Sequence, residues 1–264
     1  YAMISIVLLA FSPAFTIYAN IIWQQCILPI LIVIFYITLT RFIKYKEGKQ
    51  FVLLVIIISI AAQLHMSAFF IFPLLILIAI FYRKEIGIKY LALAIFCALI
   101  LFLPYLYHLF FEKELAKLIS YGTTHRSVYW KIFRQHIRIA SFDFFRYYFR
   151  YDFNAVLTKS ISFFKFILYP LSCILMLLYV AGFISYLGWI IRKRRLFDTT
   201  EEVLVKYPLP FQIAGSMTLT VTITYLLLKV ETPPHYLIVL FPAYSILTGF
   251  TAYRLWNFFW VRIV

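Results

Sequence analysis

The chain has few charged residues, few glycines and few cysteines, and each shortage excludes a class of protein. Charged residues make up 13% of the 264 positions and hydrophobic residues 64%, a balance that excludes a soluble globular fold and is typical of membrane proteins with several spans. The seven glycines form no Walker or dinucleotide-binding motif, which argues against nucleotide-driven chemistry. The three cysteines, Cys26, Cys97 and Cys173, lie in apolar runs with neither metal-ligand nor disulfide spacing.

Acidic residues are also scarce, since ten of them stand against 25 Lys and Arg and leave a formal net charge of +15. In a soluble protein this excess would suggest nucleic acid as a partner. Here the basic residues gather in short segments between apolar runs, as they do in the cytoplasmic loops of membrane proteins. We therefore expect the charge to mark topology, membrane lipids to surround the protein, and no nucleic acid to bind.

Residues 51–82 form a long stretch without any formal charge, with basic residues on both sides of it. The stretch is too long for one span of about 20 residues and short for two, and its basic flanks place both ends on the cytoplasmic side. Gln63 to Ser67 is the only polar cluster within it that could form a turn. Each arm would then have about 15 residues, roughly 22 Å at 1.5 Å per residue, which is less than the ~30 Å hydrocarbon core. We predict that the chain turns below the outer membrane surface, with His65 at the floor of an outward-facing cavity and Gln63 beside it.

These signals predict an all-α, polytopic membrane protein that forms a single membrane domain over residues 1–264. About eight transmembrane helices are expected, at about 2–18, 26–40, 51–63, 67–82, 90–111, 167–191, 209–228 and 237–256. The four proposed cytoplasmic segments hold 4, 3, 5 and 2 Lys or Arg, whereas the three short outer turns hold 0, 0 and 1. This asymmetry agrees with the positive-inside rule.

Residues 112–166 are expected to form an extracytoplasmic segment of one or two interfacial helices. Lys131, Arg134 and Arg138 recur there at helical spacing, mixed with aromatic residues, as in helices that lie in the membrane interface. Two interpretations stay open. The segment either is an amphipathic belt that only anchors the protein, or presents some arginines to the cavity, where they hold an anionic lipid headgroup.

His65 is a candidate functional residue because ionisable side chains at membrane depth are rare and usually functional. It could equally be a buried histidine that only closes the turn by bonding a neighbouring carbonyl or Gln63.

The predicted outer loop 229–236 is the second candidate, because Lys229, Glu231 and His235 lie within seven residues at the mouth of two spans. Lys229 and His235 could bind a phosphate, with Glu231 and Tyr236 lining the cavity. Alternatively, Lys229 extends to the lipid headgroups and Tyr236 belongs to an aromatic belt.

His125 and Arg126 are a third candidate anion site, for which a solvated surface pair is the alternative. No two carboxylates of the predicted outer segments form an obvious catalytic or metal-binding pair.

Three stretches, taken together and in this order, carry a resemblance to a known family. They are Phe11-Ser12-Pro13 followed by Ile17-Tyr18-Ala19-Asn20, Trp23 and Pro29; Ala62 to Ala68 around His65; and Lys229 with Pro234 to Ala243. The chain resembles the GT-C superfamily of polyprenyl-phosphate-sugar-dependent membrane glycosyltransferases, in the bacterial branch related to protein O-mannosyltransferases and aminoarabinose transferases.

This resemblance implies a multi-pass protein of a bacterial inner or plasma membrane that transfers a sugar on the extracytoplasmic face. The donor would be a lipid-linked sugar such as polyprenyl-phosphate mannose, and the acceptor a lipid, glycan or protein hydroxyl. Cationic and hydrogen-donating groups must stabilise the departing lipid phosphate, and His65, Lys229, His235 and Arg126 suit this task by position. Gln63, Glu231, Tyr236 and His125 would line the substrate cavity.

In this family the acidic motif that supplies the catalytic base, and any metal ligand, lies in the first outer loop after the first span. The chain begins with a tyrosine inside an apolar segment, so we expect a fragment that starts downstream of that loop and could be inactive alone. No cofactor is evident, and a divalent metal would take its ligands outside this chain.

Other membrane functions stay open. An O-antigen ligase or polymerase also has many spans and a long outer segment rich in Arg and His. A transporter or flippase of lipid-linked solutes is possible too, although the sequence shows no paired Gly/Pro-broken helices. A purely structural membrane subunit is the last alternative.

Overall fold

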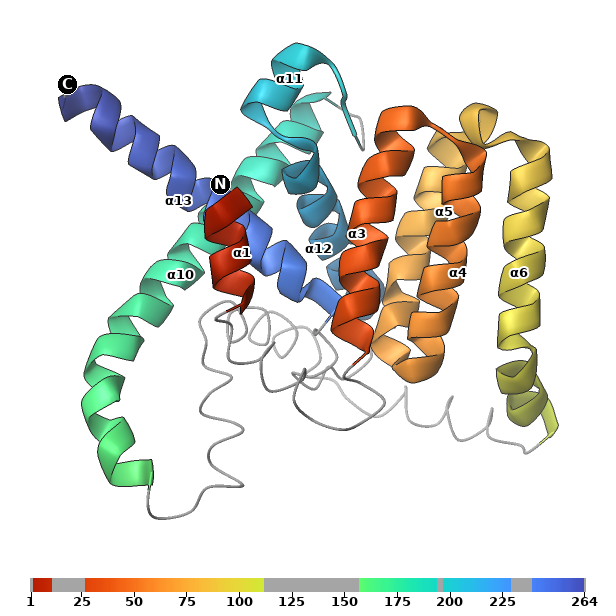
Figure 1. Ribbon diagram of the computed structural model, residues 1–264, viewed down its shortest axis with the longest axis horizontal. Coiled ribbons are helices and arrows are strands. Elements are labelled where there is room, and N and C mark those ends of the chain that lie inside the picture. The colour runs from red at the N-terminus through yellow and green to blue at the C-terminus, as the bar shows by residue number, and fades with distance from the viewer. Residues whose placement is uncertain (1, 11–26, 112–156, 194–196, 229–238, 264) are drawn as a thin grey trace.

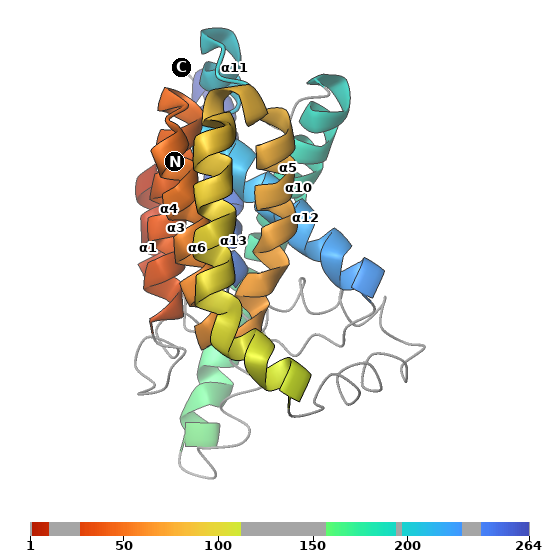
Figure 2. The same cartoon turned by 90° about the vertical axis from the view of Figure 1, so that its right-hand side faces the viewer.

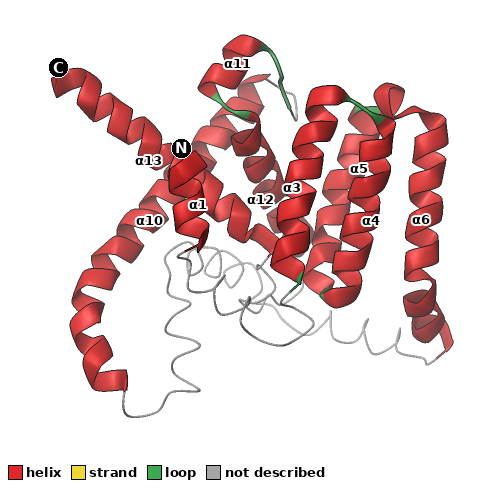
Figure 3. Ribbon diagram, in the orientation of Figure 1, coloured by secondary structure: helices red, strands yellow, loops and turns green. Residues whose placement is uncertain are grey.

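The computed structural model describes residues 2–10, 27–111, 157–193, 197–228 and 239–263, and every regular element in these ranges is helical (Figures 1 and 3). The elements are α1 (Ala2–Ala10), α3 (Leu28–Tyr45), α4 (Gly48–Leu64), the 3-10 helix η2 (Met66–Ile71), α5 (Phe72–Phe81), α6 (Arg83–Phe111), α10 (Leu157–Lys193), α11 (Glu201–Lys206), α12 (Leu209–Leu228) and α13 (Phe241–Ile263). The predicted all-helical class is confirmed.

Four segments of the described chain are long and apolar enough to cross a membrane: Leu28–Tyr45, Arg83–Leu103, Cys173–Lys193 and Leu209–Leu228. This indicates a membrane-embedded protein. Gly48–Leu64 and Ser67–Phe81 are shorter apolar helices, as expected for the two arms of the 51–82 stretch. The count of eight crossings stays a prediction.

The helices form two groups that α12 joins. In the first group α3 contacts α4, and α4 contacts α6 and η2; in the second, α13 contacts α1, α10 and α12. Figures 1 and 2 show α3, α4, α5 and α6 running side by side, with α10 and α13 on the other side of α12. Because α12 also contacts α3, α5 and η2, it is the central helix, and most of its first thirteen residues are buried.

Local sequence explains where several helices begin and end. Pro29 and Pro73 lie in the first turns of α3 and α5, where a missing N–H costs nothing. Lys46 ends α3 in the left-handed conformation (φ 56°) and donates its N–H to the Phe42 carbonyl. Gly87 (φ 74°, ψ 149°) interrupts α6, so α6 begins earlier than the predicted span at 90 and breaks before it.

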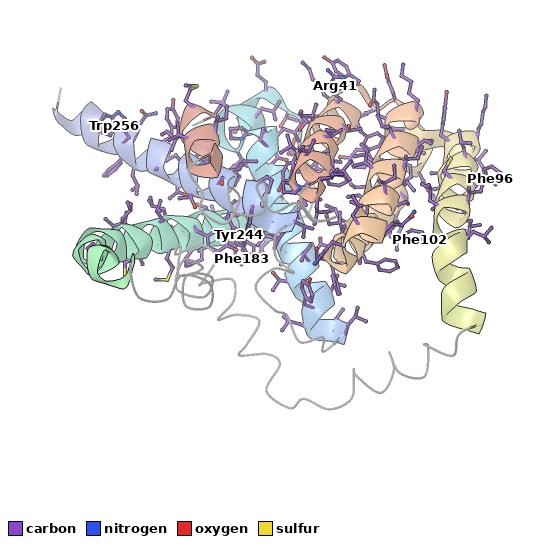
Figure 4. All side chains as sticks on the ribbon, turned by 60° about the horizontal axis from the view of Figure 1, so that its bottom comes forward. Arg41, Phe96, Phe102, Phe183, Tyr244 and Trp256 are labelled. Carbon is purple, nitrogen blue, oxygen red and sulfur yellow. The ribbon has the colours of Figure 1, made fainter. Side chains whose placement is uncertain are left out.

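Most of the charged residues in the described helices lie at one end of the bundle, which we call the basic end; Lys159 and Lys165, near the start of α10, lie away from it. The basic end is the end where α3 gives way to α4 and α5 to α6, and where α11 lies (Figure 1). Its basic side chains are Arg41, Lys44, Lys46, Lys49, Arg83, Lys84, Lys89, Arg192, Lys193 and Lys206. Figure 4 labels Arg41 there. His65 lies at the opposite end of α4, as the predicted topology requires.

Glycines allow close contacts between helices, as small residues do in membrane bundles. Gly215 of α12 lies against the ring of Tyr186 of α10, and Gly249 of α13 lies against Ser5 of α1. A Cβ atom at either position would overlap its neighbour. The second group of helices therefore depends on these glycines for its spacing.

We expect Gly182→Ala in α10 to lower the free energy of unfolding by about 1–3 kcal/mol, the usual cost of overpacking. The added Cβ would lie 2.6 Å from Thr251 Oγ1 and 2.8 Å from the Leu247 carbonyl oxygen of α13. Gly188 on the same helix is the matched control, because a Cβ there meets nothing within 4 Å and alanine is favoured in helices by roughly 0.5–1 kcal/mol. Thermal unfolding in one detergent compares the two, and equal shifts would contradict the close α10–α13 contact.

Candidate functional site

The break between α4 and η2 falls within the polar cluster 63–67, where the sequence predicts a turn. α4 ends at Leu64, and His65 follows in extended conformation (φ −156°, ψ 126°). Its N–H donates to the Ala61 carbonyl at 2.9 Å, and its own carbonyl accepts from the Ala68 N–H at 3.0 Å. His65 therefore ends one helix and begins the next with both of its backbone groups paired, as a break at membrane depth requires.

The His65 ring is fixed by Ser67. Nδ1 accepts from the Ser67 backbone N–H at 3.2 Å and lies 2.7 Å from Ser67 Oγ. Because a backbone N–H can only donate, Nδ1 must be an acceptor, so the neutral ring carries its hydrogen on Nε2. The residue is 8% exposed. The turn thus holds a buried imidazole in one orientation and one tautomer, with Nε2–H as a donor.

The turn packs against the far end of α12. Phe70 of η2 stacks on Tyr225, with ring centroids 3.9 Å apart and an interplanar angle of 30°, and Tyr225 is fully buried. α12 ends at Leu228, less than one helical turn beyond Tyr225. The His65 turn thus rests on the last turn of α12, the helix that precedes the predicted loop 229–236 in the sequence.

Gln63 contributes to the packing of the turn on α6. Its side-chain amide is exposed at the surface of the bundle and donates to the Leu101 carbonyl at 2.8 Å, three residues before Pro104. Phe69 and Phe72 also meet Phe102 of α6, each at 5.6 Å between ring centroids. In Figure 4, Phe102 lies toward the neighbouring helices and Phe96 points away from them.

The other predicted site residues lie outside the described residues: Lys229, His235, Arg126, Glu231, Tyr236 and His125. Of the eight predicted residues, the structure thus places His65 and Gln63, two residues apart in one turn. Gln63 uses its amide on the α6 backbone, and His65 is held by Ser67. Their joint role with the outer loops stays a prediction.

A cluster of buried hydroxyl groups between α10, α12 and α13 was not predicted. The Tyr179 hydroxyl hydrogen-bonds the side chains of Thr218 and Tyr244, and the Tyr179 and Tyr244 rings meet edge to face at 4.7 Å. Figure 4 labels Tyr244 where α10 and α13 meet. Threonine hydroxyls in helices often bond the carbonyl four residues back, as Thr218 Oγ1 does with Ala214 at 2.9 Å, so sequence alone does not reveal that Thr218 also meets Tyr179.

Gln212 was also missed, because it lies within a predicted span. It is fully buried at the start of α12, where its Oε1 accepts from the Asp198 N–H at 2.8 Å. Its Nε2 donates to the Asp198 carbonyl at 2.9 Å and to the Tyr207 carbonyl at 2.8 Å. A single amide therefore closes the loop between α10 and α12 at the basic end.

Arg254 of α13 holds the same loop from outside. Its guanidinium donates to the Lys206 carbonyl at 2.7 Å and lies over the rings of Tyr207 and Phe250, 5.0 and 4.8 Å from their centroids. Stacking of this kind is worth about 0.5–2 kcal/mol. At this end of the bundle, Gln212 and Arg254 hold the loop between α10 and α12 in place.

The five carboxylates in the described part of the chain, Glu47, Glu85, Asp198, Glu201 and Glu202, all lie at the basic end, far along the helices from His65. Within the described ranges, no three His, Cys, Asp or Glu side chains are placed to hold a metal ion.

Comparisons of the chain with protein-family models, with curated proteins and with solved structures gave no significant match.

Proposed function

We propose that the chain belongs to a membrane glycosyltransferase that moves a sugar from a polyprenyl-phosphate-linked donor to a hydroxyl acceptor on the extracytoplasmic face. The proposal is carried by one observation: Ser67 fixes the ring of His65 in one orientation and one tautomer, in a buried turn at the end of α4 opposite the basic end.

The chemistry of the reaction explains why such a group is useful. When the sugar leaves its carrier, negative charge develops on the lipid phosphate, and preorganised donors lower the barrier by stabilising that charge. A histidine ring that Ser67 already holds in one orientation needs no reorganisation to take part in such a site. Lys229, His235 and Arg126 would supply further positive charge, and a carboxylate outside the described residues would take the proton of the acceptor hydroxyl.

The charge distribution supports the orientation. Basic residues flanking apolar helices stay in the cytoplasm, so the basic end would face the cytoplasm and the His65 turn the other side. This fits a multi-pass protein of the bacterial inner or plasma membrane. No divalent metal is assigned to the described residues.

The test is equilibrium binding of a polyprenyl-phosphate sugar to the protein in nanodiscs, by a radiolabelled-donor filtration assay. We expect saturable binding that polyprenyl phosphate competes for and neutral polyprenol does not, because the site recognises the phosphate. A protein that is folded and monodisperse but binds all three lipids equally weakly would overturn the proposal.

A further inference from the structure

A groove runs along α12 between α5 and α10. On one side it is lined by a face of α12, with residues at spacings of three and four from 216 to 228. The facing side of α5 forms the other wall, and α10 closes one end. The groove has a volume of about 710 Å³. Ile76 and Phe81 of α5 and Ile223 and Leu227 of α12 line the groove and are 44 to 76% exposed. The groove is therefore open at the surface of the bundle.

The lining takes a hydrocarbon chain better than a polar molecule. The lining is mostly apolar, and most of its hydroxyl groups have partners: Ser216 Oγ bonds the Tyr186 hydroxyl at 2.8 Å, and Thr224 Oγ1 donates to the Thr220 carbonyl at 2.8 Å. The α5 wall from Pro73 to Phe81 extends about 12 Å at 1.5 Å per residue, close to half of the ~30 Å hydrocarbon core. The groove thus has the length of one lipid chain in one leaflet.

Apolar lining alone does not select an occupant in a membrane, because lipid tails are as apolar as the protein. The basic residues at one end of the groove do select one, because they attract a negatively charged headgroup. Phe81 is followed by Arg83 and Lys84, and Ile190 of the groove is followed by Arg192 and Lys193. These four side chains are exposed, and Glu85 is the one acid next to them on α6.

We propose that the groove is a binding site for an anionic phospholipid of the leaflet at the basic end. One acyl chain lies between α5 and α12, and the phosphate contacts the basic residues that follow Phe81 and Ile190. Arg and Lys donate charge-assisted hydrogen bonds to phosphate oxygens, and basic pockets between membrane helices hold anionic headgroups. This site does not depend on the glycosyltransferase proposal, whose donor phosphate lies at the opposite end.

The experiment uses full-length protein in nanodiscs of phosphatidylcholine with a small fraction of photoactivatable lipid that carries a diazirine in its acyl chain. The probe is phosphatidylglycerol in one sample and phosphatidylcholine in the other, and labelled peptides are mapped by mass spectrometry. We expect phosphatidylglycerol to label α5 and α12 peptides at least tenfold more than phosphatidylcholine does. Equal labelling by the two probes would overturn the proposal, whatever the variants show.

Two sets of variants locate the site. Ile223→Trp and Ile76→Trp each fill the groove and should remove the labelling. Ile100→Trp, at an exposed position of α6, is their control and should leave the labelling unchanged. The combined variant Arg83→Gln and Lys84→Gln should reduce labelling at least fivefold, since each basic residue near a membrane surface raises the affinity for anionic lipid roughly fivefold. Combined Lys44→Gln and Lys46→Gln is the matched control on α3. Labelling that survives both filling variants, or that falls equally in the control, would contradict the assignment.

Discussion

Replacing Gln212 by leucine is expected to lower the free energy of unfolding by about 2–5 kcal/mol. Leucine has a similar volume but leaves the Asp198 N–H and the carbonyls of Asp198 and Tyr207 without the partner that the amide supplies. Each buried polar group that loses its partner costs about 1–3 kcal/mol, and the site is fully buried. Thermal unfolding in detergent measures the loss, and limited proteolysis should show earlier cleavage between residues 197 and 208.

Gln63→Leu is the matched control for this prediction, because it makes the same change at the other end of the bundle. Gln63 is exposed and makes one bond, to the Leu101 carbonyl, so its loss should cost no more than about 1 kcal/mol. If the two variants unfold at the same temperature, the loop between α10 and α12 does not depend on Gln212.

Composition and charge pattern predicted the helical class because both depend on averages over many residues. The polar cluster 63–67 predicted the helix break because it is the one place in 51–82 where several polar side chains lie together, and Ser67 does bond His65. The break at Gly87 was not predicted. Glycine only permits a left-handed backbone, and whether the chain uses that freedom depends on how α4 and α6 pack.

The candidate site was predictable only in part, for a related reason. His65 and Ser67 are two residues apart, so local sequence could bring them together. The contacts of Gln212 with Asp198 and of Tyr179 with Thr218 and Tyr244 join different helices or distant loop positions, and one sequence does not show which polar residues will face each other. The roles of Lys229, His235 and Arg126 stay predictions.

The two ring nitrogens of His65 would have different roles: Nδ1 caps the helix η2, and Nε2–H would bind the donor phosphate. His65→Asn is expected to separate these two roles. Asparagine can still accept from the Ser67 N–H, as it does at the starts of many helices, but it has no group at the position of Nε2–H. We therefore expect His65→Asn to fold with nearly unchanged stability and to bind a polyprenyl-phosphate sugar at least tenfold more weakly, a loss of about 1.4 kcal/mol. Binding isotherms and melting temperatures measured on the same preparations separate the two effects.

Two further variants complete the series. His65→Ala removes the cap as well and should lose both donor affinity and about 0.5–2 kcal/mol of stability. Ser67→Ala keeps the backbone N–H but removes the hydroxyl 2.7 Å from Nδ1, so affinity should fall by less than in His65→Asn because the ring is held by one bond instead of two. If His65→Asn binds the donor as the unmodified protein does, the histidine only closes the turn, and the lipid phosphate must be held by other residues.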